Sequence, residues 1–406
     1  MSKLALLALG INGIIGSGVF VLPGKLGQSL GIWAAVLFFV CGLMLTPIAL
    51  VYAELSSRFD SNGGPYEFAL KTLGKESAFP IGWLNWFTCI VSTSTVSSAF
   101  PIYLEYFFPN QFPMVVSQVL AGAMILLFAF INTFGIRYGS KTMTMITWIK
   151  IAPLVAIVIA AIPSFKEIPM SPLPKLNDLG GGILSILFLY TGFEIIPVVS
   201  GESSHSKKTV PWATVTSLFI CVVFYVFIQS AVMAQPLAIG SEKPITMLAE
   251  GLWGGWGGKL IGLTGLISIL GFISGSAITA PRMLMPIVEQ GQLPRLLSDG
   301  KSEKKSLNAA IWPGAIVSAA LCFFNTMTEL LELATLAVAA QYLFSSLCLM
   351  KISLKEKKHV VLTVLSLLMS CVFLYWVPGV AWRGLFLALA LGYCIRYFPR
   401  RGLVSV

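Results

Sequence analysis

The sequence predicts an all-α polytopic membrane protein, and three observations carry this prediction. First, 56% of the 406 residues are hydrophobic and only 11% are charged, whereas a soluble domain carries about 25% charged residues. Second, the mean hydropathy is +0.86, so a water-soluble fold could not hide its apolar side chains. Third, the apolar residues fall into runs of about 20 residues, the length that a helix needs to cross a bilayer.

Twelve such runs follow one another, and we expect residues 1–406 to form a single transmembrane domain. The expected spans lie near residues 4–28, 33–57, 78–107, 113–133, 142–163, 179–201, 211–235, 259–288, 308–325, 329–350, 359–377 and 380–397. Only Asn325, Thr326 and their neighbours separate the ninth span from the tenth, so this boundary is the least defined.

Lys and Arg residues set the expected orientation. Twelve spans put both termini on one side of the membrane, and placing the termini inside puts most of the 27 Lys and Arg residues in cytoplasmic segments. We therefore expect a multi-pass protein of a cytoplasmic (inner) membrane with both termini in the cytoplasm. The net charge of +10 is interpreted as contact with anionic lipid rather than with nucleic acid, because no basic run is interleaved with exposed aromatic residues.

Cysteine and histidine usage argues against a cofactor. All seven cysteines lie inside apolar runs, none forms a CxxC pair, and His205 and His359 are the only histidines. We expect no metal, no haem and no disulfide framework. No histidine lies in the interior of a span and no two acids converge there, so the residues also argue against an intramembrane enzyme.

Two of the spans carry helix-breaking residues near their middle. The first contains Gly13, Gly16-Ser17-Gly18 and Pro23-Gly24, and the sixth contains Thr191-Gly192-Phe193-Glu194 and Pro197. Glycine costs about 1 kcal/mol in a helix interior and proline about 3 kcal/mol. We expect both spans to unwind at these points.

Unwound backbone inside a membrane is tolerated only where it faces protein or a watery cavity. There a new helix start offers free N–H groups and a helix end offers free C=O groups, which together suit an α-carboxylate and an α-ammonium. Close helix packing is the alternative explanation of Gly16-Ser17-Gly18. The pair of breaks, five spans apart, favours two inverted five-helix repeats with a binding site between them.

Two charged residues lie at depth in the expected spans. Lys150 occupies the middle of the span 142–163 and should face the bundle interior, although snorkelling to the interface is the alternative. Burial disfavours its charged form, so this lysine could load and release a proton. Glu194 lies beside the second break, and two roles stay open for it: a local cap for freed backbone donors, or gating and substrate binding. Arg282, near the inner end of the span 259–288, is interpreted as a gate or a lipid-headgroup contact.

At these residues the sequence resembles the amino acid–polyamine–organocation (APC) superfamily of permeases, and the match covers nearly the whole chain. Each piece is short, but their order and spacing are specific. The pieces are Gly16-Ser17-Gly18-Val19-Phe20-Val21-Leu22-Pro23, Tyr52-Ala53-Glu54-Leu55, Gly63-Gly64-Pro65-Tyr66, Gly82-Trp83, Tyr190-Thr191-Gly192-Phe193-Glu194, Pro281-Arg282-Met283 and Gly291-Gln292-Leu293-Pro294.

The resemblance implies a five-plus-five inverted-repeat fold, with repeats over about 4–163 and 179–350 and two extra helices over about 359–397. It also implies alternating access and a set of substrate contacts. The backbone at Ile14, Gly16, Ser17 and Gly18 would take the substrate carboxylate, and carbonyls of Phe188, Leu189 and Thr191, beside Gly192, would take the ammonium. The Phe188 ring would cover the substrate. Lys150 would fill the place where sodium-coupled relatives hold Na⁺, bridging the first, fifth and eighth spans.

The function expected on these grounds is proton-coupled, sodium-independent uptake of neutral amino acids. Neutral substrates are favoured because Glu194 is the only acid placed to meet a cationic side chain. An amino acid exchanger is the main alternative, and a polyamine or cationic amino acid permease fits less well. Two alternatives come from other functional classes: a channel, and a nutrient sensor that binds amino acids without transporting them. Proton, amino acid and lipid are the expected partners, and the residues leave monomer and homodimer open.

Overall fold

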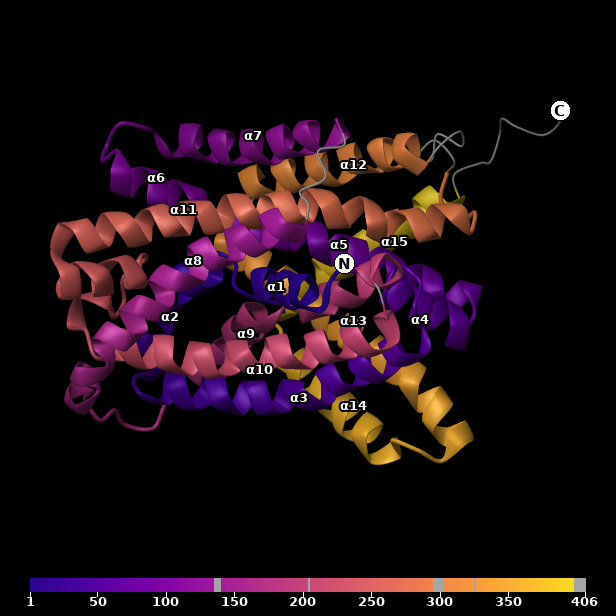
Figure 1. Ribbon diagram of the computed structural model, residues 1–406, viewed down its shortest axis with the longest axis horizontal. Helices are drawn as coiled ribbons and strands as arrows, with labels where there is room; N and C mark the ends of the chain where they lie inside the picture. The colour runs from indigo at the N-terminus through magenta and orange to yellow at the C-terminus, as the bar shows by residue number, and fades with distance from the viewer. Residues whose placement is uncertain (135–139, 204, 295–302, 325, 398–406) are drawn as a thin grey trace.

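The computed structural model describes residues 1–134, 140–203, 205–294, 303–324 and 326–397. Throughout these ranges the chain is helical with short connections, and no strand occurs in them (Figure 1). This confirms the all-α class predicted from composition.

Ten elements make up the first half of the chain. They are α1 (Lys3–Ile14), α2 (Gly18–Leu30), α3 (Trp33–Arg58), α4 (Pro65–Thr72), α5 (Lys75–Ser97), α6 (Phe100–Phe107), α7 (Met114–Thr133), α8 (Ser140–Ala161), the 3-10 helix η1 (Ile162–Glu167) and α9 (Leu176–Tyr190). The second half holds η2 (Phe193–Glu202), α10 (Ser206–Met233), η3 (Pro236–Ala238), α11 (Pro244–Glu289), α12 (Glu303–Phe324), α13 (Met327–Glu356), α14 (Val360–Tyr375) and α15 (Gly379–Tyr397).

Each expected span falls on one of these helices or on a broken pair of them. Among the described residues, nine helical stretches are long and apolar enough to cross a membrane, and the bent pair α1–α2 raises the number to ten. Three of the nine run across two neighbouring elements, namely α5 and α6, α8 and η1, and α9 and η2. Residues Ala309–Phe324 of α12 and the whole of α14 are apolar but shorter. The chain is therefore a multi-pass helical membrane protein.

The boundary between α12 and α13 is set by a helix cap. The Thr326 side chain accepts a hydrogen bond from the Glu329 N–H, and the Glu329 carboxylate accepts one from the Thr326 N–H, which is a complete capping box. Asn325 lies outside the described residues. The predicted division between the two helices at this point is confirmed.

The expected long span over 78–107 is not one helix. It divides into α5 and α6 at a turn formed by Ser98 and Ala99, just before Pro101. Proline is favoured at the first positions of a helix, where its missing N–H would have no acceptor within the helix. The proline therefore starts α6 instead of extending α5.

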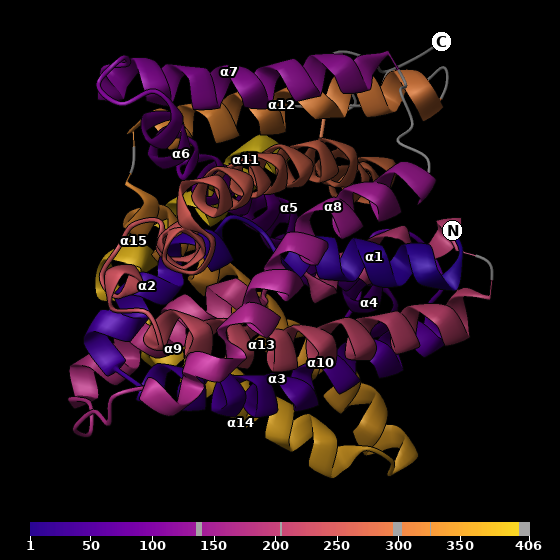
Figure 2. The ribbon, with the colours of Figure 1, turned by 60° about the vertical axis from the view of Figure 1, so that its left-hand side comes forward.

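The helices form a bundle with α1 in its interior (Figures 1 and 2). Helices α7 and α12 pair along one edge, and α14 lies at the opposite edge against α3 and α13. Inside, α1 packs on α8, α10 and η2, while α2 packs on α9 and α11. The two halves of the first broken span thus contact elements that come much later in the chain.

Candidate functional site

The first break separates α1 from α2. Ile15 leaves the helical conformation, with φ −81° and ψ 81°, and the two helix axes differ by 46°. Helix α2 begins at Gly18, so its first N–H groups have no acceptor within the helix and form the positive end of the helix dipole. The predicted unwinding at Gly16-Ser17 is confirmed.

The second break separates α9 from η2. Thr191 is extended, with φ −65° and ψ 146°, and Gly192 has φ +127°. A side chain is strained at that φ, which explains the glycine. Downstream of Gly192 the chain runs as a 3-10 helix through Pro197. The predicted unwinding of the second span is confirmed as well.

The two broken spans touch through their backbones, because the second break lies against the last turn of α1, directly before the first break. A Cβ atom built on Gly192 would lie 2.3 Å from the carbonyl carbon of Gly13 and 2.6 Å from the Ile14 nitrogen. A Cβ on Gly13 would lie 3.0 Å from the Gly192 carbonyl oxygen. The two glycines therefore serve close backbone approach, and they bring residues far apart in the sequence to one point.

The residues expected to bind substrate surround this point. A Cβ on Gly18 would lie 2.8 Å from Leu189 Cδ2 and 3.5 Å from Phe188 Cε1, so α2 begins directly beside the end of α9. Gly16 faces Val96 and Phe272, which come from α5 and α11. Every member of the expected set is buried except Thr191, which is half-buried.

Several carbonyl groups at the breaks are already engaged. The Ile14 oxygen accepts hydrogen bonds from the Tyr225 hydroxyl at 2.9 Å and from the Gly16 N–H at 3.0 Å. The Phe188 oxygen accepts from the Thr191 hydroxyl at 2.7 Å and from the Thr191 N–H at 3.1 Å. Because a carbonyl has two lone pairs, an ammonium group reaches the Phe188 oxygen only by replacing one of these donors.

Lys150 of α8 is fully buried and points toward α1. Its Nζ donates to the carbonyl of Asn12 at 3.1 Å and to that of Ile15 at 2.5 Å. These carbonyls end α1, where the helix dipole is negative and a cation is stabilised. The side chain does not snorkel to an interface.

Helix α11 reaches one of these carbonyls, that of Ile15, through Ser268, which also bonds the carbonyl of Gly16. The Ser268 hydroxyl lies 3.2 Å from the Gly16 oxygen and 3.5 Å from the Ile15 oxygen. Elements of the first, fifth and eighth expected spans therefore meet at one break. Lys150 bonds α1 directly, while α11 joins through a hydroxyl instead of a charge.

Glu194 is buried at the start of η2. Its Oε2 accepts hydrogen bonds from the Gly192 N–H at 2.9 Å and from the Tyr342 hydroxyl at 3.1 Å. The first bond satisfies a backbone donor that the break frees, as a capping side chain does. The second ties the break to α13, where the Phe193 and Tyr342 rings also stack at 5.5 Å.

Two buried polar atoms near the breaks have no hydrogen-bond partner among the described residues. They are Asn12 Oδ1 on α1 and Ser274 Oγ on α11. A Cβ on Gly275, which follows Ser274, would lie 3.8 Å from Asn12 Nδ2, so the Asn12 amide lies at the contact between α1 and α11. Buried polar atoms ordinarily find partners, which makes this contact suited to a polar ligand.

A second group of charges joins three elements at one end of the bundle. The Arg282 guanidinium of α11 lies 2.7 Å from the Glu202 carboxylate at the end of η2. The terminal amino group of Met1 donates to the Glu202 carbonyl. The segment before α1 and the C-terminal parts of η2 and α11 are thus held together. This arrangement suits the interpretation of Arg282 as a gate.

Sequence reasoning did not find Tyr225, Tyr342, Ser268 or Asn12 as parts of this site. Each acts on a residue far away along the chain, such as Tyr225 on Ile14, 211 residues apart. Tyrosine and serine inside apolar spans commonly serve helix packing, so their identity alone carried no signal.

Two broken helices that meet inside a membrane bundle, with helix ends facing each other, are typical of secondary transporters. The chain belongs to the amino acid permease family, whose profile matches residues 1–395. This confirms the resemblance to the APC superfamily. The chain is accordingly a membrane transport protein and not an enzyme.

Three of the similar proteins come from Bacillus subtilis (strain 168). The serine/threonine exchanger SteT is 28% identical over 71% of this chain and 68% of its own length. The methylthioribose transporter is 24% identical over 99% of this chain and 93% of its own length. The branched-chain amino acid permease BcaP is 24% identical over 86% of this chain and 79% of its own length.

Proposed function

We propose that this chain takes up neutral amino acids across a cytoplasmic (inner) membrane by alternating access, coupled to a proton and independent of sodium. The observation that carries the proposal is the backbone contact between the two breaks, at Gly13 and Gly192. It sets a helix start at Gly18 beside a helix end at Tyr190. Such a pair of ends complements a zwitterion without charged side chains.

The proposed architecture has twelve spans and both termini in the cytoplasm. Repeat one covers about residues 4–163 and repeat two about 179–350, in inverted orientation, while residues 359–397 lie outside the repeats. The positions of the breaks support this arrangement, because they interrupt the first span of each proposed repeat and contact each other.

In the proposed substrate complex, the N–H groups at Ser17 and Gly18 bind the carboxylate, with Ile14 and Gly16 shaping the break. The carbonyls of Leu189 and Thr191 bind the ammonium, and that of Phe188 joins them when the Thr191 hydroxyl turns away. The Phe188 ring, next to Gly18, covers the bound molecule. Gly192 keeps the two breaks in contact.

Lys150 is the proposed coupling residue. When charged, it makes charge-assisted hydrogen bonds to the Asn12 and Ile15 carbonyls, which hold α1 against α8. Loss of its proton weakens both bonds and frees α1 to move. Its ammonium also supplies a fixed positive charge at this break, so no Na⁺ is needed there. Glu194 is the proposed gating residue, because it links the second break to Tyr342 of α13.

The preference for neutral substrates is supported by the surroundings of Glu194. Its carboxylate already accepts bonds from Gly192 and Tyr342, and no other carboxylate from the described residues lies at the breaks. A cationic side chain would therefore find no free partner. The branched-chain amino acid permease among the relatives is compatible with this preference.

Exchange of amino acids is the second candidate. It is favoured by the similarity to a serine/threonine exchanger. Exchange and proton symport use the same proposed substrate site. They differ in whether the transporter can change between its inward-facing and outward-facing states without bound substrate.

Uptake into proteoliposomes separates these candidates. A panel of labelled amino acids is offered with and without a pH gradient, a sodium gradient and internal amino acid. Symport requires uptake of neutral amino acids driven by an inward proton gradient, and exchange requires uptake only with internal substrate. Uptake driven by a sodium gradient alone would refute sodium independence.

A further inference from the structure

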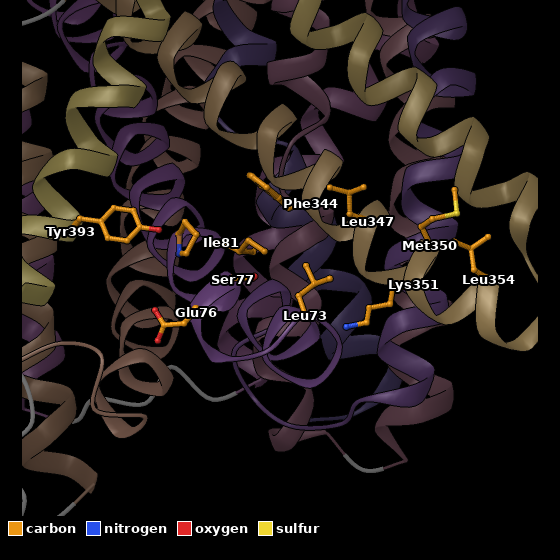
Figure 3. A pocket seen from close by; sticks show the side chains of 11 residues that line it. Leu73, Glu76, Ser77, Ile81, Phe344, Leu347, Met350, Lys351, Leu354 and Tyr393 are labelled. Atoms are coloured by element: carbon orange, nitrogen blue, oxygen red, sulfur yellow. The ribbon is translucent and has the colours of Figure 1, made fainter.

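A cavity of about 660 Å³ lies away from the two breaks, between the start of α5, the end of α13 and the end of α15 (Figure 3). Its volume falls within the roughly 300–1,000 Å³ that is usual for small-molecule sites. None of the residues assigned to transport lines it, so the proposed function leaves it without a role.

One wall of the cavity is an apolar stripe on α13. Phe344, Leu347, Met350 and Leu354 line it at intervals of three or four residues, which places them on one face of the helix. Leu347 is 39% exposed and Leu354 64% exposed. Leu347 lies within the expected span 329–350, so this part of the stripe is open to lipid chains, whereas Leu354 lies beyond Lys351, toward the expected cytoplasmic segment.

The edge of the cavity carries charge. Figure 3 shows Lys351 and Glu76 along the same edge, the lower one in that view, with Phe344 and Leu347 above them. The Glu76 carboxylate is already paired with Arg396 at 2.5 Å, and the Arg396 guanidinium also stacks over the Phe79 ring at 4.8 Å. The acid at this edge is neutralised by the protein itself.

The lysines near the edge are not neutralised in this way. No ion pair formed within the described ranges uses Lys351. Lys75 precedes Glu76, and Lys355 lies one helical turn after Lys351, and both are exposed. The edge therefore has a net positive charge beside an apolar stripe.

We propose that this cavity is a binding site for a phospholipid with an anionic head group. An acyl chain lies along the α13 stripe, and the phosphate receives hydrogen bonds from the Lys351 ammonium, a charge-assisted contact. Basic pockets between membrane helices on the cytoplasmic side are suited to anionic lipids, and this end of the bundle carries the lysines that we place in the cytoplasm. Bound there, the lipid joins α5, α13 and α15.

Phosphatidylglycerol and phosphatidylcholine serve as probes in native mass spectrometry of the detergent-purified full-length protein. Lys351→Gln removes the proposed head-group contact, and Leu347→Trp fills the cavity from an exposed position that tolerates a larger side chain. Lys358→Gln is the matched control, because Lys358 is an exposed lysine that does not line the cavity. Thermal unfolding of each variant establishes that it is folded.

The wild type and Lys358→Gln should retain phosphatidylglycerol in preference to phosphatidylcholine. Lys351→Gln should lower phosphatidylglycerol retention about five-fold, as expected from about 1 kcal/mol per lysine at an anionic surface, and leave phosphatidylcholine unchanged. Leu347→Trp should lower both lipids.

Two results would overturn the proposal. One is unchanged phosphatidylglycerol retention in both Lys351→Gln and Leu347→Trp. The other is a wild-type dimer that Leu347→Trp converts to a monomer with lipid retention unchanged, because this face would then be an interface between two copies. Neither outcome depends on transport, so a failure here is distinguishable from a failure of the proposed uptake function.

Discussion

Replacing Gly192 with alanine tests whether the two breaks depend on backbone contact. The new Cβ would lie 2.3 Å from the Gly13 carbonyl carbon, whereas carbon atoms in contact stay at least about 3.5 Å apart, so the two segments must separate by roughly 1 Å. Overpacking of this kind costs about 1–3 kcal/mol. The backbone at φ +127° adds about 1–3 kcal/mol of strain for a residue with a side chain.

The two effects together predict a loss of roughly 2–6 kcal/mol, spread over stability and the geometry of the site. Thermal unfolding in detergent should show a lower melting temperature for Gly192→Ala, and binding of a radiolabelled amino acid should be lost. Gly181→Ala is the matched control, since Gly181 lies in α9 and a Cβ there meets nothing within 4 Å. Alanine in a helix is favoured by about 1 kcal/mol over glycine, so this control should be as stable as the wild type or more so.

The reasoning would be refuted by a Gly192→Ala protein that melts and binds like the Gly181→Ala control. Such a result would mean that the breaks are not held together through Gly13 and Gly192, and the proposed zwitterion site would lose its main support.

Substitutions at three further positions test the side chains around the breaks. Lys150→Met should abolish stimulation of uptake by a pH gradient in proteoliposomes, because it removes the only ammonium bonded to the end of α1 among the described residues. Glu194→Ala should lower the melting temperature, since the Gly192 N–H loses its acceptor at a cost of about 1–3 kcal/mol; Glu194→Gln keeps an acceptor oxygen and should unfold near the wild-type temperature, so its uptake reports on gating. Tyr225→Phe should destabilise by about 0.5–1.5 kcal/mol in denaturant unfolding, because the Ile14 carbonyl loses a hydrogen bond.

Controls for these substitutions come from exposed positions. Lys166→Met removes an exposed lysine of η1, and Tyr375→Phe removes the hydroxyl of a tyrosine that is 80% exposed. If a pH gradient stimulates uptake by Lys150→Met as strongly as uptake by Lys166→Met, Lys150 is ruled out as the coupling residue. Equal unfolding of Tyr225→Phe and Tyr375→Phe would show that the buried hydroxyl does not stabilise α1.

The sequence was sufficient where the cause of a structural feature is local. Gly192 and Pro197 weaken their own helix, so the second break could be predicted from the local sequence alone. The burial of Lys150 followed from its depth in an apolar run. The division of 78–107 into two helices could also have been predicted, because Pro101 is a local signal. We expected one span there because the apolar run is continuous.

The sequence was insufficient where the cause is a contact between distant segments. Nothing beside Tyr342 in the sequence indicates that its hydroxyl bonds Glu194, 148 residues away. The same holds for Ser268 and the Gly16 carbonyl, which are 252 residues apart. The Thr191 hydroxyl folds back onto the Phe188 carbonyl and occupies one of its lone pairs. Helix propensity does not predict this hydrogen bond. Such pairings require the helix arrangement.

The carbonyl groups at the end of α1 have a consequence for how the protein is made. Their partners are Lys150, Tyr225 and Ser268, so during synthesis these carbonyls emerge long before the groups that bond them. An unpaired carbonyl in lipid is costly. We therefore expect α1 to stay near the translocation channel or the membrane surface until the later segments have been inserted. Crosslinking of ribosome-bound chains tests this: a probe in α1 should leave its aqueous or channel environment only when the chain extends past Ser268, and early release into lipid would contradict it.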